Sequence, residues 1–305
     1  MTLKSQNRAY VYASLVVLFW GTSATAFKIG LNYLSTVQLL FWSSLAATTI
    51  LFLVLCSQHK FKQLSAATPA QLGRSVMLGF LNPFLYYLVL FKAYSLLPAQ
   101  VAQPLNYIWP IVLVLLAAIF LGQKLHWYDL LALLVSFTGV TLISSQGSIN
   151  IFSRSNPLGV VLALSSSIVW ATFWIVNMQK NAGDEVVTLF LSFASASIFC
   201  LIAMVTLGGF AKPLPWQGIL ASAYIGAFEM GITFVLWLKA LNLATSTAKL
   251  GNFSYLVPFV ALIFISLILN EKIIWTTVAG LICIIGAILF QQYLGRKLDN
   301  EGQKP

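Results

Sequence analysis

The feature that most constrains this chain is a duplication within strongly hydrophobic sequence, because the residue pattern of the first half returns in the second. The matching pairs are Trp20 with Trp170, Gly79 with Gly226, Asn82 with Glu229, Lys92 with Lys239, Tyr107 with Tyr255 and Pro110 with Pro258. The glycines stand 147 positions apart (226 − 79), and the prolines stand 148 positions apart (258 − 110). A pattern kept at nearly one spacing predicts two structurally equivalent halves.

The composition of the chain places both halves in a membrane. Of 305 residues, 59% are hydrophobic and only 8% are charged. Apolar stretches of about 20 residues can cross a hydrocarbon core of about 30 Å, and they must be helical because lipid offers no partners for backbone groups. We therefore predict an all-α membrane protein with ten transmembrane helices. The expected spans are residues 10–31, 36–56, 72–94, 99–121, 127–145, 158–179, 186–207, 216–241, 245–269 and 275–294.

The spans divide into a first repeat over residues 10–145 and a second over residues 158–294, each with five helices. Because five is an odd number, the second repeat enters the membrane from the opposite side, and the two repeats are inverted. Lys and Arg are more frequent in the loops that share a side with the termini, so we expect both termini to be cytoplasmic. The net charge of +10 is then a signal for orientation and for membrane lipids. We expect no nucleic-acid partner, since these charges are spread thinly.

The N-terminus also resembles a secretory signal peptide. Lys4 and Arg8 precede an apolar run that ends near the small residues 24–26. However, Trp20 has an internal counterpart in Trp170, and loss of the first helix would break the five-plus-five symmetry. We therefore expect the first helix to be retained.

The paired prolines predict broken helices at equivalent places. Pro110 and Pro258 each remove a helix hydrogen bond, and matching discontinuities in inverted halves are typical of the binding sites of secondary transporters. This pattern predicts alternating access between the halves, with both prolines as hinges. The alternative is a static kink packed against neighbouring helices.

Two ionisable side chains are expected within the membrane, where charge is costly and usually functional. Glu229 and Lys249 lie in the eighth and ninth predicted helices. One interpretation is that they contact the polar end of a substrate, or that Glu229 binds a coupling proton. The other is that they pair with each other and seal a helix interface.

Polar and aromatic residues in the same region supply further candidates for substrate contact. Asn82 and Tyr86 share a helix face with Gly79, which suits either a pore lining or a seam between helices. Trp109 and Trp170 lie deep in their spans beside polar residues, and we expect them to form an aromatic cavity wall rather than to contact lipid. The remaining candidates are Gln103, Tyr107, Asn252 and Tyr255.

Other functional classes find little support in the sequence. The two histidines, His59 and His126, fall in predicted loops, and the three cysteines lack the spacing of a metal site or a disulfide. We therefore expect no metal, no cofactor and no enzymatic activity. There is no Walker motif for direct ATP use and no ring of charges or filter motif for a channel. A structural or lipid-handling membrane protein is an alternative, but it leaves the duplicated breaks unexplained.

Local motifs add a family resemblance. Trp20-Gly21 lies near the start, Asn270-Glu271-Lys272 forms a turn, and the last helix carries Gly280 and Gly286. With two five-helix units, this layout resembles the EamA type of the drug/metabolite transporter superfamily. The segment 122–124 departs from that pattern, since an acidic residue often stands there.

Within that superfamily the chain is most similar to bacterial exporters of aromatic amino acids. The resemblance implies an inner-membrane exporter of these amino acids or of similar small amphipathic metabolites. Other amino acids, nucleobases, nucleosides and cationic compounds are alternative substrates. The direction of net flux, proton coupling and the choice between monomer and homo-oligomer are left open by the sequence.

Overall fold

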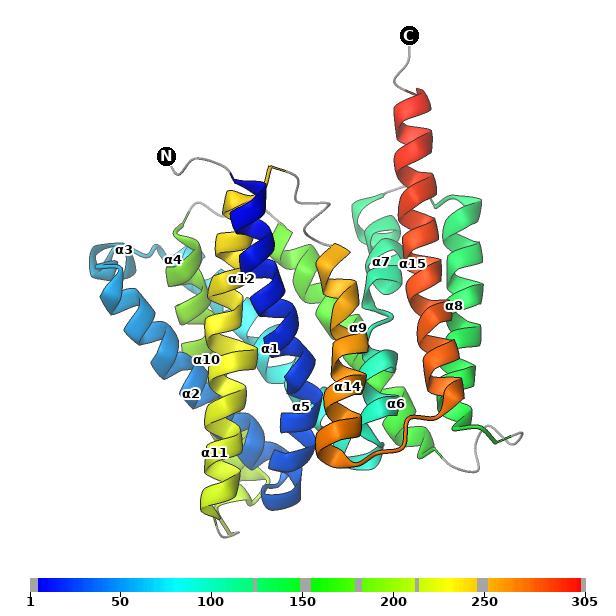
Figure 1. The fold of residues 1–305 in the computed structure, drawn as a ribbon. Helices are drawn as coiled ribbons and strands as arrows, with labels where there is room; N and C mark the ends of the chain where they lie inside the picture. The colour runs from blue at the N-terminus through cyan, green and yellow to red at the C-terminus, as the bar shows by residue number, and fades with distance from the viewer. Residues whose placement is uncertain are drawn as a thin grey trace.

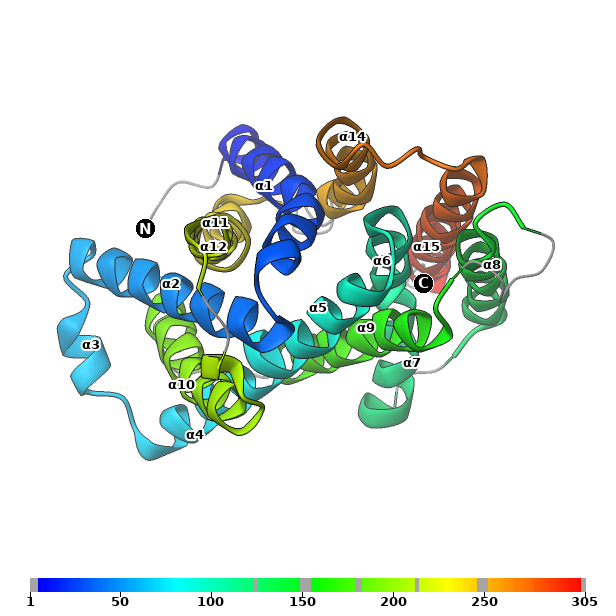
Figure 2. The same cartoon turned by 90° about the horizontal axis from the view of Figure 1, so that it is seen from below.

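The computed structural model describes residues 5–122, 125–148, 155–178, 183–211, 214–245 and 252–302, and the regular elements in these ranges are helices (Figures 1 and 2). The first half contains α1 (Gln6–Tyr33), α2 (Thr36–Ser57), α3 (Phe61–Ser65), α4 (Pro69–Gly79), η1 (Phe80–Leu85), α5 (Tyr86–Leu96), α6 (Ala99–Asn106), α7 (Trp109–Leu121) and α8 (Trp127–Ser145). The second contains α9 (Pro157–Met178), α10 (Glu185–Thr206), η2 (Gly209–Ala211), α11 (Trp216–Tyr224), η3 (Ile225–Gly231), α12 (Ile232–Leu243), η4 (Asn252–Leu256), α14 (Val257–Leu269) and α15 (Trp275–Gly302).

The helix content confirms the predicted fold class. Within the described ranges, nine continuous or broken helices are long and apolar enough to cross a membrane, and the shorter apolar helix Phe253–Leu269 completes a set of ten. The start of α1 and the end of α15 lie at the same end of the bundle, at the top of Figure 1, as an even number of crossings requires. The helix α15 extends beyond the rest of the bundle at that end.

Equivalent helices in the two halves begin with different caps. At the start of α2, Ser35 and Gln38 form a capping box, whereas at the start of α10 the Asp184 carboxylate accepts two backbone N–H groups at 2.9 and 3.2 Å. The Lys60 ammonium lies 2.7 Å from the Asp184 carboxylate and so ties the segment between α2 and α3 to the start of α10. Burial alone would raise the pKa of Asp184, but Lys60 and the backbone donors outweigh it and lower that pKa overall.

The third and eighth spans are both interrupted by π-helical segments, η1 and η3, with one of the matching glycines at the start of each: Gly79 directly precedes η1, and Gly226 is the second residue of η3. A Cβ atom at Gly79 would lie 2.1 Å from the carbonyl oxygen of Ser192, and one at Gly226 would lie 2.5 Å from that of Ser43. Each glycine therefore permits close contact with a neighbouring helix, α10 in one case and α2 in the other. The glycines belong to helix seams and not to a pore lining.

The break in η1 changes the face on which Asn82 lies. Asn82 has φ −147° and ψ 122°, which is extended backbone inside an otherwise helical segment, and its peptide bond to Pro83 is cis. The prediction that Gly79, Asn82 and Tyr86 share one regular helix face is therefore wrong. The helical spacing of three and four residues on which it relied does not hold across the break.

The fourth span is divided where the sequence predicted a kink. The helix α6 ends at Asn106, and α7 begins at Trp109 with Pro110 in its first turn. Likewise, Pro258 lies in the first turn of α14, directly after the 3₁₀ turn η4. Each proline thus lies at the start of a new helix rather than bending a continuous one. N–H groups in the first turn of a helix have no partner within it, so the missing N–H of proline costs no helix hydrogen bond. A hinge function at these positions stays a prediction.

Candidate functional site

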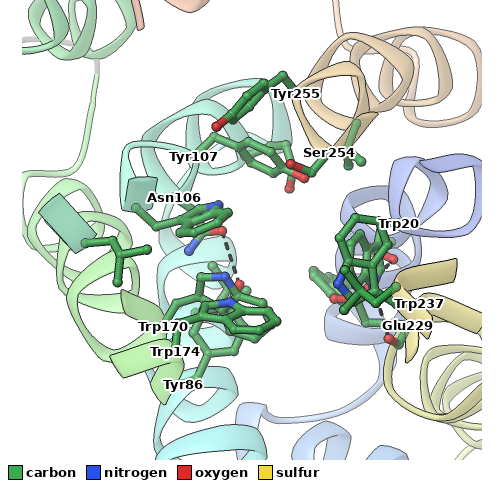
Figure 3. A pocket seen from close by; sticks show the side chains of 18 residues that line it. Trp20, Tyr86, Asn106, Tyr107, Trp170, Trp174, Glu229, Trp237, Ser254 and Tyr255 are labelled. Atoms are coloured by element: carbon green, nitrogen blue, oxygen red, sulfur yellow. Dashed lines mark hydrogen bonds between the residues drawn. The ribbon is translucent and has the colours of Figure 1, made fainter. Parts of the chain in front are cut away.

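A cavity of about 270 Å³ lies at the centre of the bundle, between the two halves. It is lined by side chains from α1, α5, α6 and α7 of the first half and from α9, η3, α12, η4 and α14 of the second (Figure 3). Its size is close to the lower end of the range usual for small-molecule sites, about 300 Å³. The helix breaks at Asn106–Trp109, in η3 and in η4 all border it.

The cavity brings together most of the residues that the sequence predicted to contact a substrate. Those that line it are Tyr86, Gln103, Tyr107, Trp109, Trp170, Glu229 and Tyr255. Asn82 does not line it and is only 1% exposed within the helix packing. Lys249 and the side chain of Asn252 lie outside what the structure describes.

One wall of the cavity is built around Glu229. Its side chain is buried, and its two carboxylate oxygens accept hydrogen bonds from the hydroxyl of Ser23 and, at 2.8 Å, from that of Tyr87. The indole N–H of Trp20 donates to the backbone oxygen of Glu229 at 3.3 Å. The described partners of this carboxylate are therefore neutral hydroxyls from α1 and α5. Pairing with Lys249 stays a prediction.

The opposite wall is aromatic, as Figure 3 shows. The ring of Tyr86 lies 4.7 Å from that of Trp170 between centroids, and Trp174 packs edge-on to Trp170 at 6.0 Å. The Tyr86 hydroxyl donates to the Asn106 side-chain oxygen at 3.1 Å, and the Asn106 amide donates to Ser166 at 2.8 Å. These bonds fix the Tyr86 ring by a polar contact at its edge, and the two indole rings pack against it and each other.

A third group of side chains comes from the two broken helices. Tyr107 follows the end of α6, and Tyr255 lies in η4, where its hydroxyl accepts a hydrogen bond from Gln292 of α15. Gln103 and Trp109 lie on different stripes of a regular helix, yet both reach the cavity. They do so because the helix is interrupted between Asn106 and Trp109.

At the end of the bundle opposite the termini, the halves are joined by hydrogen bonds. The Glu271 carboxylate accepts the backbone N–H groups of Ala99 and Gln100 at 2.9 and 3.1 Å, at the start of α6. The Gln100 side chain in turn donates to the Lys272 carbonyl at 2.9 Å and accepts from the Ile274 N–H at 3.0 Å. The segment before α15 is thereby fixed to α6.

Several cavity residues were not among the predicted contacts. They are Trp20, Ser23, Phe27, Asn106, Trp174, Trp237 and Ser254, with apolar neighbours. Helical spacing could have indicated some of them, since Trp237 lies two turns after Glu229 and Trp174 one turn after Trp170. Ser23 likewise lies one turn after Trp20, but that spacing does not reveal its contact with Glu229, 206 residues away.

Comparison with known proteins assigns the family. The model of the EamA-like transporter family matches residues 7–145 and 157–291, which is most of the chain. The chain belongs to this family. It is therefore an EamA-type transporter of the drug/metabolite transporter superfamily and a multi-pass membrane protein.

Relatives of this EamA-type chain include an uncharacterized transporter and two proteins whose names give different substrates. An uncharacterized transporter of Archaeoglobus fulgidus is 27% identical over 93% of this chain and 97% of its own. The aromatic amino acid exporter YddG of Salmonella typhimurium is 24% identical over 60% of this chain and 64% of its own. A protein named as a probable terminal-alkyne amino-acid exporter in Streptantibioticus cattleyicolor is 25% identical over 93% and 94%.

A solved crystal structure shares the fold of this EamA-type chain. It superposes with a TM-score of 0.66 and 18% sequence identity, and the match covers 96% of this chain and 99% of the other. At that identity the likeness supports the arrangement of the helices alone.

Proposed function

We propose that this EamA-type transporter exports aromatic amino acids, or similar small amphipathic metabolites, by alternating access between its two inverted halves. The observation that carries the proposal is the central cavity, in which tryptophan and tyrosine rings surround a few fixed polar groups. Flat rings bind well between aromatic walls, while polar anchors orient the charged end of an amino acid. The substrate passes through unchanged, without a cofactor.

The same proposal assigns substrate contact to the cavity residues that the sequence predicted. In it, Trp109 and Trp170 stack against the aromatic part of the substrate, and Glu229 contacts its polar end. Tyr86, Gln103, Tyr107 and Tyr255 complete the surrounding wall. Lys249 and Asn252 are retained as further candidates. Asn82 is not, because its side chain lies outside the cavity.

We further propose that the protein resides in the inner membrane of a bacterial cell, with both termini in the cytoplasm. The Lys and Arg distribution supports this orientation, and the position of both ends on one side of the bundle is compatible with it. A small epitope tag after Pro305 tests it. Protection of the tag from labelling in intact cells is expected, and labelling from outside would overturn the orientation.

Transport by the purified protein in liposomes tests the function directly. Proteoliposomes are loaded with radiolabelled L-tryptophan, L-phenylalanine, L-leucine or uridine, and efflux is measured with and without a pH gradient. We expect the two aromatic amino acids to leave faster than leucine or uridine, and faster than from liposomes without protein. Equal rates for all four solutes would contradict aromatic selectivity, and faster efflux of uridine would favour a nucleoside exporter.

A further inference from the structure

We propose that the cavity recognises the ammonium group of its substrate through Glu229 and does not require the carboxylate, so that aromatic primary amines are ligands in their own right. This inference rests on the proposed function, because it takes the central cavity as the substrate site. It adds a rule for the charged end of the ligand that neither the family nor the names of its relatives provide.

The first observation is the charge of the cavity wall. Among the side chains described as lining the cavity, Glu229 is the carboxylate, and Lys, Arg and His do not occur. A carboxylic acid buried there would place its negative charge near another without a described cation to balance it. An ammonium group would instead neutralise Glu229, and opposite charges stabilise each other most where water is excluded.

The hydrogen bonds of Glu229 leave room for such a ligand. Each carboxylate oxygen accepts one described hydroxyl, from Ser23 or from Tyr87. An ionised carboxylate has about four acceptor sites, so the two hydroxyls orient the group without filling it. Both described partners are neutral, so neither of them compensates its negative charge. An ammonium group brings three donors and a positive charge.

The aromatic rings beside Glu229 suit a cation as well. Trp20 and Trp237 lie on the same side of the cavity as Glu229 in Figure 3, with ring centroids 5.8 Å apart. The face of an indole ring attracts a nearby ammonium group, and the attraction is stronger in a desolvated site. The carboxylate and the two indoles therefore form one cation-binding corner.

The neutral amides of the cavity are engaged in other bonds, which weakens the case for a dedicated carboxylate site. Asn106 accepts from Tyr86 and donates to Ser166. The side-chain oxygen of Gln103 accepts from Tyr94. A ligand carboxylate could accept only from the remaining N–H groups of these amides, which carry no formal charge, so its loss should cost less affinity than loss of the ammonium group.

A set of three indole ligands tests the rule on the full-length wild-type protein in detergent. L-tryptophan carries both charged groups, tryptamine only the ammonium, and indole-3-propionate only the carboxylate. Dissociation constants are measured at pH 7 by isothermal titration calorimetry. We expect tryptamine to bind within a few-fold of tryptophan, and indole-3-propionate to bind about tenfold or more weakly, as for loss of a hydrogen bond to a charged group.

Variants then assign the preference to Glu229. The Glu229→Gln substitution should weaken the binding of tryptamine about tenfold or more and bring its affinity close to that of indole-3-propionate. Glu229→Asp, which retains the charge, should keep part of the preference for the amine. Glu185→Gln is a matched control, because Glu185 is exposed at the start of α10 and bonds to Asn242 outside the cavity. It should bind all three ligands like the wild type.

The outcomes separate this inference from the function on which it rests. Equal or tighter binding of indole-3-propionate by the wild type would overturn the ammonium rule while leaving an aromatic substrate in place. A preference for tryptamine that persists in Glu229→Gln would overturn the assignment to Glu229. If the wild type bound none of the three ligands, the ammonium rule and the aromatic substrate would both fail. The measurement on the wild type decides the charge rule even if Glu229→Gln does not fold.

Discussion

Asn82 and Glu229 occupy matching positions in the two halves, yet the structure gives them different surroundings. Both follow a glycine by three residues, and both lie in a π-helical interruption of a span. Glu229 lines the central cavity and is held by Ser23 and Tyr87. Asn82 is 1% exposed, does not line the cavity, and both of its side-chain polar atoms lack a hydrogen-bond partner among the described residues.

The difference shows that matching sequence positions in the two halves need not have matching surroundings. The glycines serve the same purpose in both halves, since each allows a close helix contact. The polar residues three positions later do not, because the extended conformation at Asn82 turns the chain away from a regular helical course. We infer that the shared breaks provide the scaffold, and that the second half supplies the charged contact.

The strongest test of this asymmetry changes Asn82 to a carboxylic acid. Asn82→Asp would place a charge where the described structure offers no partner, and it should destabilise the protein by about 3–5 kcal/mol, as for an uncompensated buried charge. Asn82→Leu should be nearly neutral, since it removes polar atoms that have no described partner. Thermal unfolding in detergent measures both. Wild-type stability of Asn82→Asp would show that this position reaches water or a cation.

The glycine seams should respond alike in both halves. Gly79→Ala and Gly226→Ala each force a Cβ atom against a backbone oxygen, and each should cost about 1–3 kcal/mol, as overpacking does. Gly73→Ala is the control within α4, because a Cβ atom there would meet nothing within 4 Å. It should leave the melting temperature unchanged or raise it. A large loss at one seam alone would break the structural equivalence of the halves.

Trp20 and Trp170, on opposite sides of the cavity in Figure 3, test whether both sides contact the substrate. Trp20→Ala and Trp170→Ala should each weaken binding of L-tryptophan several-fold, since an aromatic contact contributes about 0.5–1.5 kcal/mol beyond its buried area. Trp216→Ala is the control, because Trp216 is 70% exposed at the start of α11. If both cavity variants were expressed and bound L-tryptophan like the wild type, the two rings would have a purely structural role.

The prolines should have the smallest effect on stability and a measurable one on rate. Pro110 and Pro258 lie in first helical turns, so replacement by Ala should change the free energy of unfolding by about 1 kcal/mol or less. A restored N–H can extend each helix across its break, and turnover should then fall more than substrate affinity. Turnover in proteoliposomes and affinity in detergent are measured separately. Wild-type turnover in both variants would show that the prolines are not hinges.

Much of the fold could be predicted from the sequence because lipid leaves a chain few choices. Long apolar stretches had to be helices, and the span count followed from their length. The division of the fourth span was indicated by Pro110, although the start of a new helix there was not. Local sequence rules place a proline near a break, but packing decides on which side the helix resumes.

The site was less predictable because it depends on contacts between distant segments. The cavity position of Glu229 could be predicted because charged residues deep within a span are rare. That of Trp170 could be predicted because the ring lies deep within a span beside polar residues. The exclusion of Asn82 from the site could not be predicted, because it depends on the backbone conformation of η1. The pairing of Ser23 with Glu229 could not be predicted either, because it joins the first helix of one half to the interrupted helix of the other.

The most direct test of the central claim compares transport by two variants at the matching positions. Efflux of L-tryptophan from proteoliposomes is measured for the wild type, Glu229→Gln and Asn82→Leu, at equal amounts of folded protein. The account predicts that Glu229→Gln reduces transport about tenfold or more, as for loss of a charged hydrogen-bond partner, while Asn82→Leu stays near the wild-type rate. An equal loss in both variants, or wild-type transport by Glu229→Gln, would contradict it.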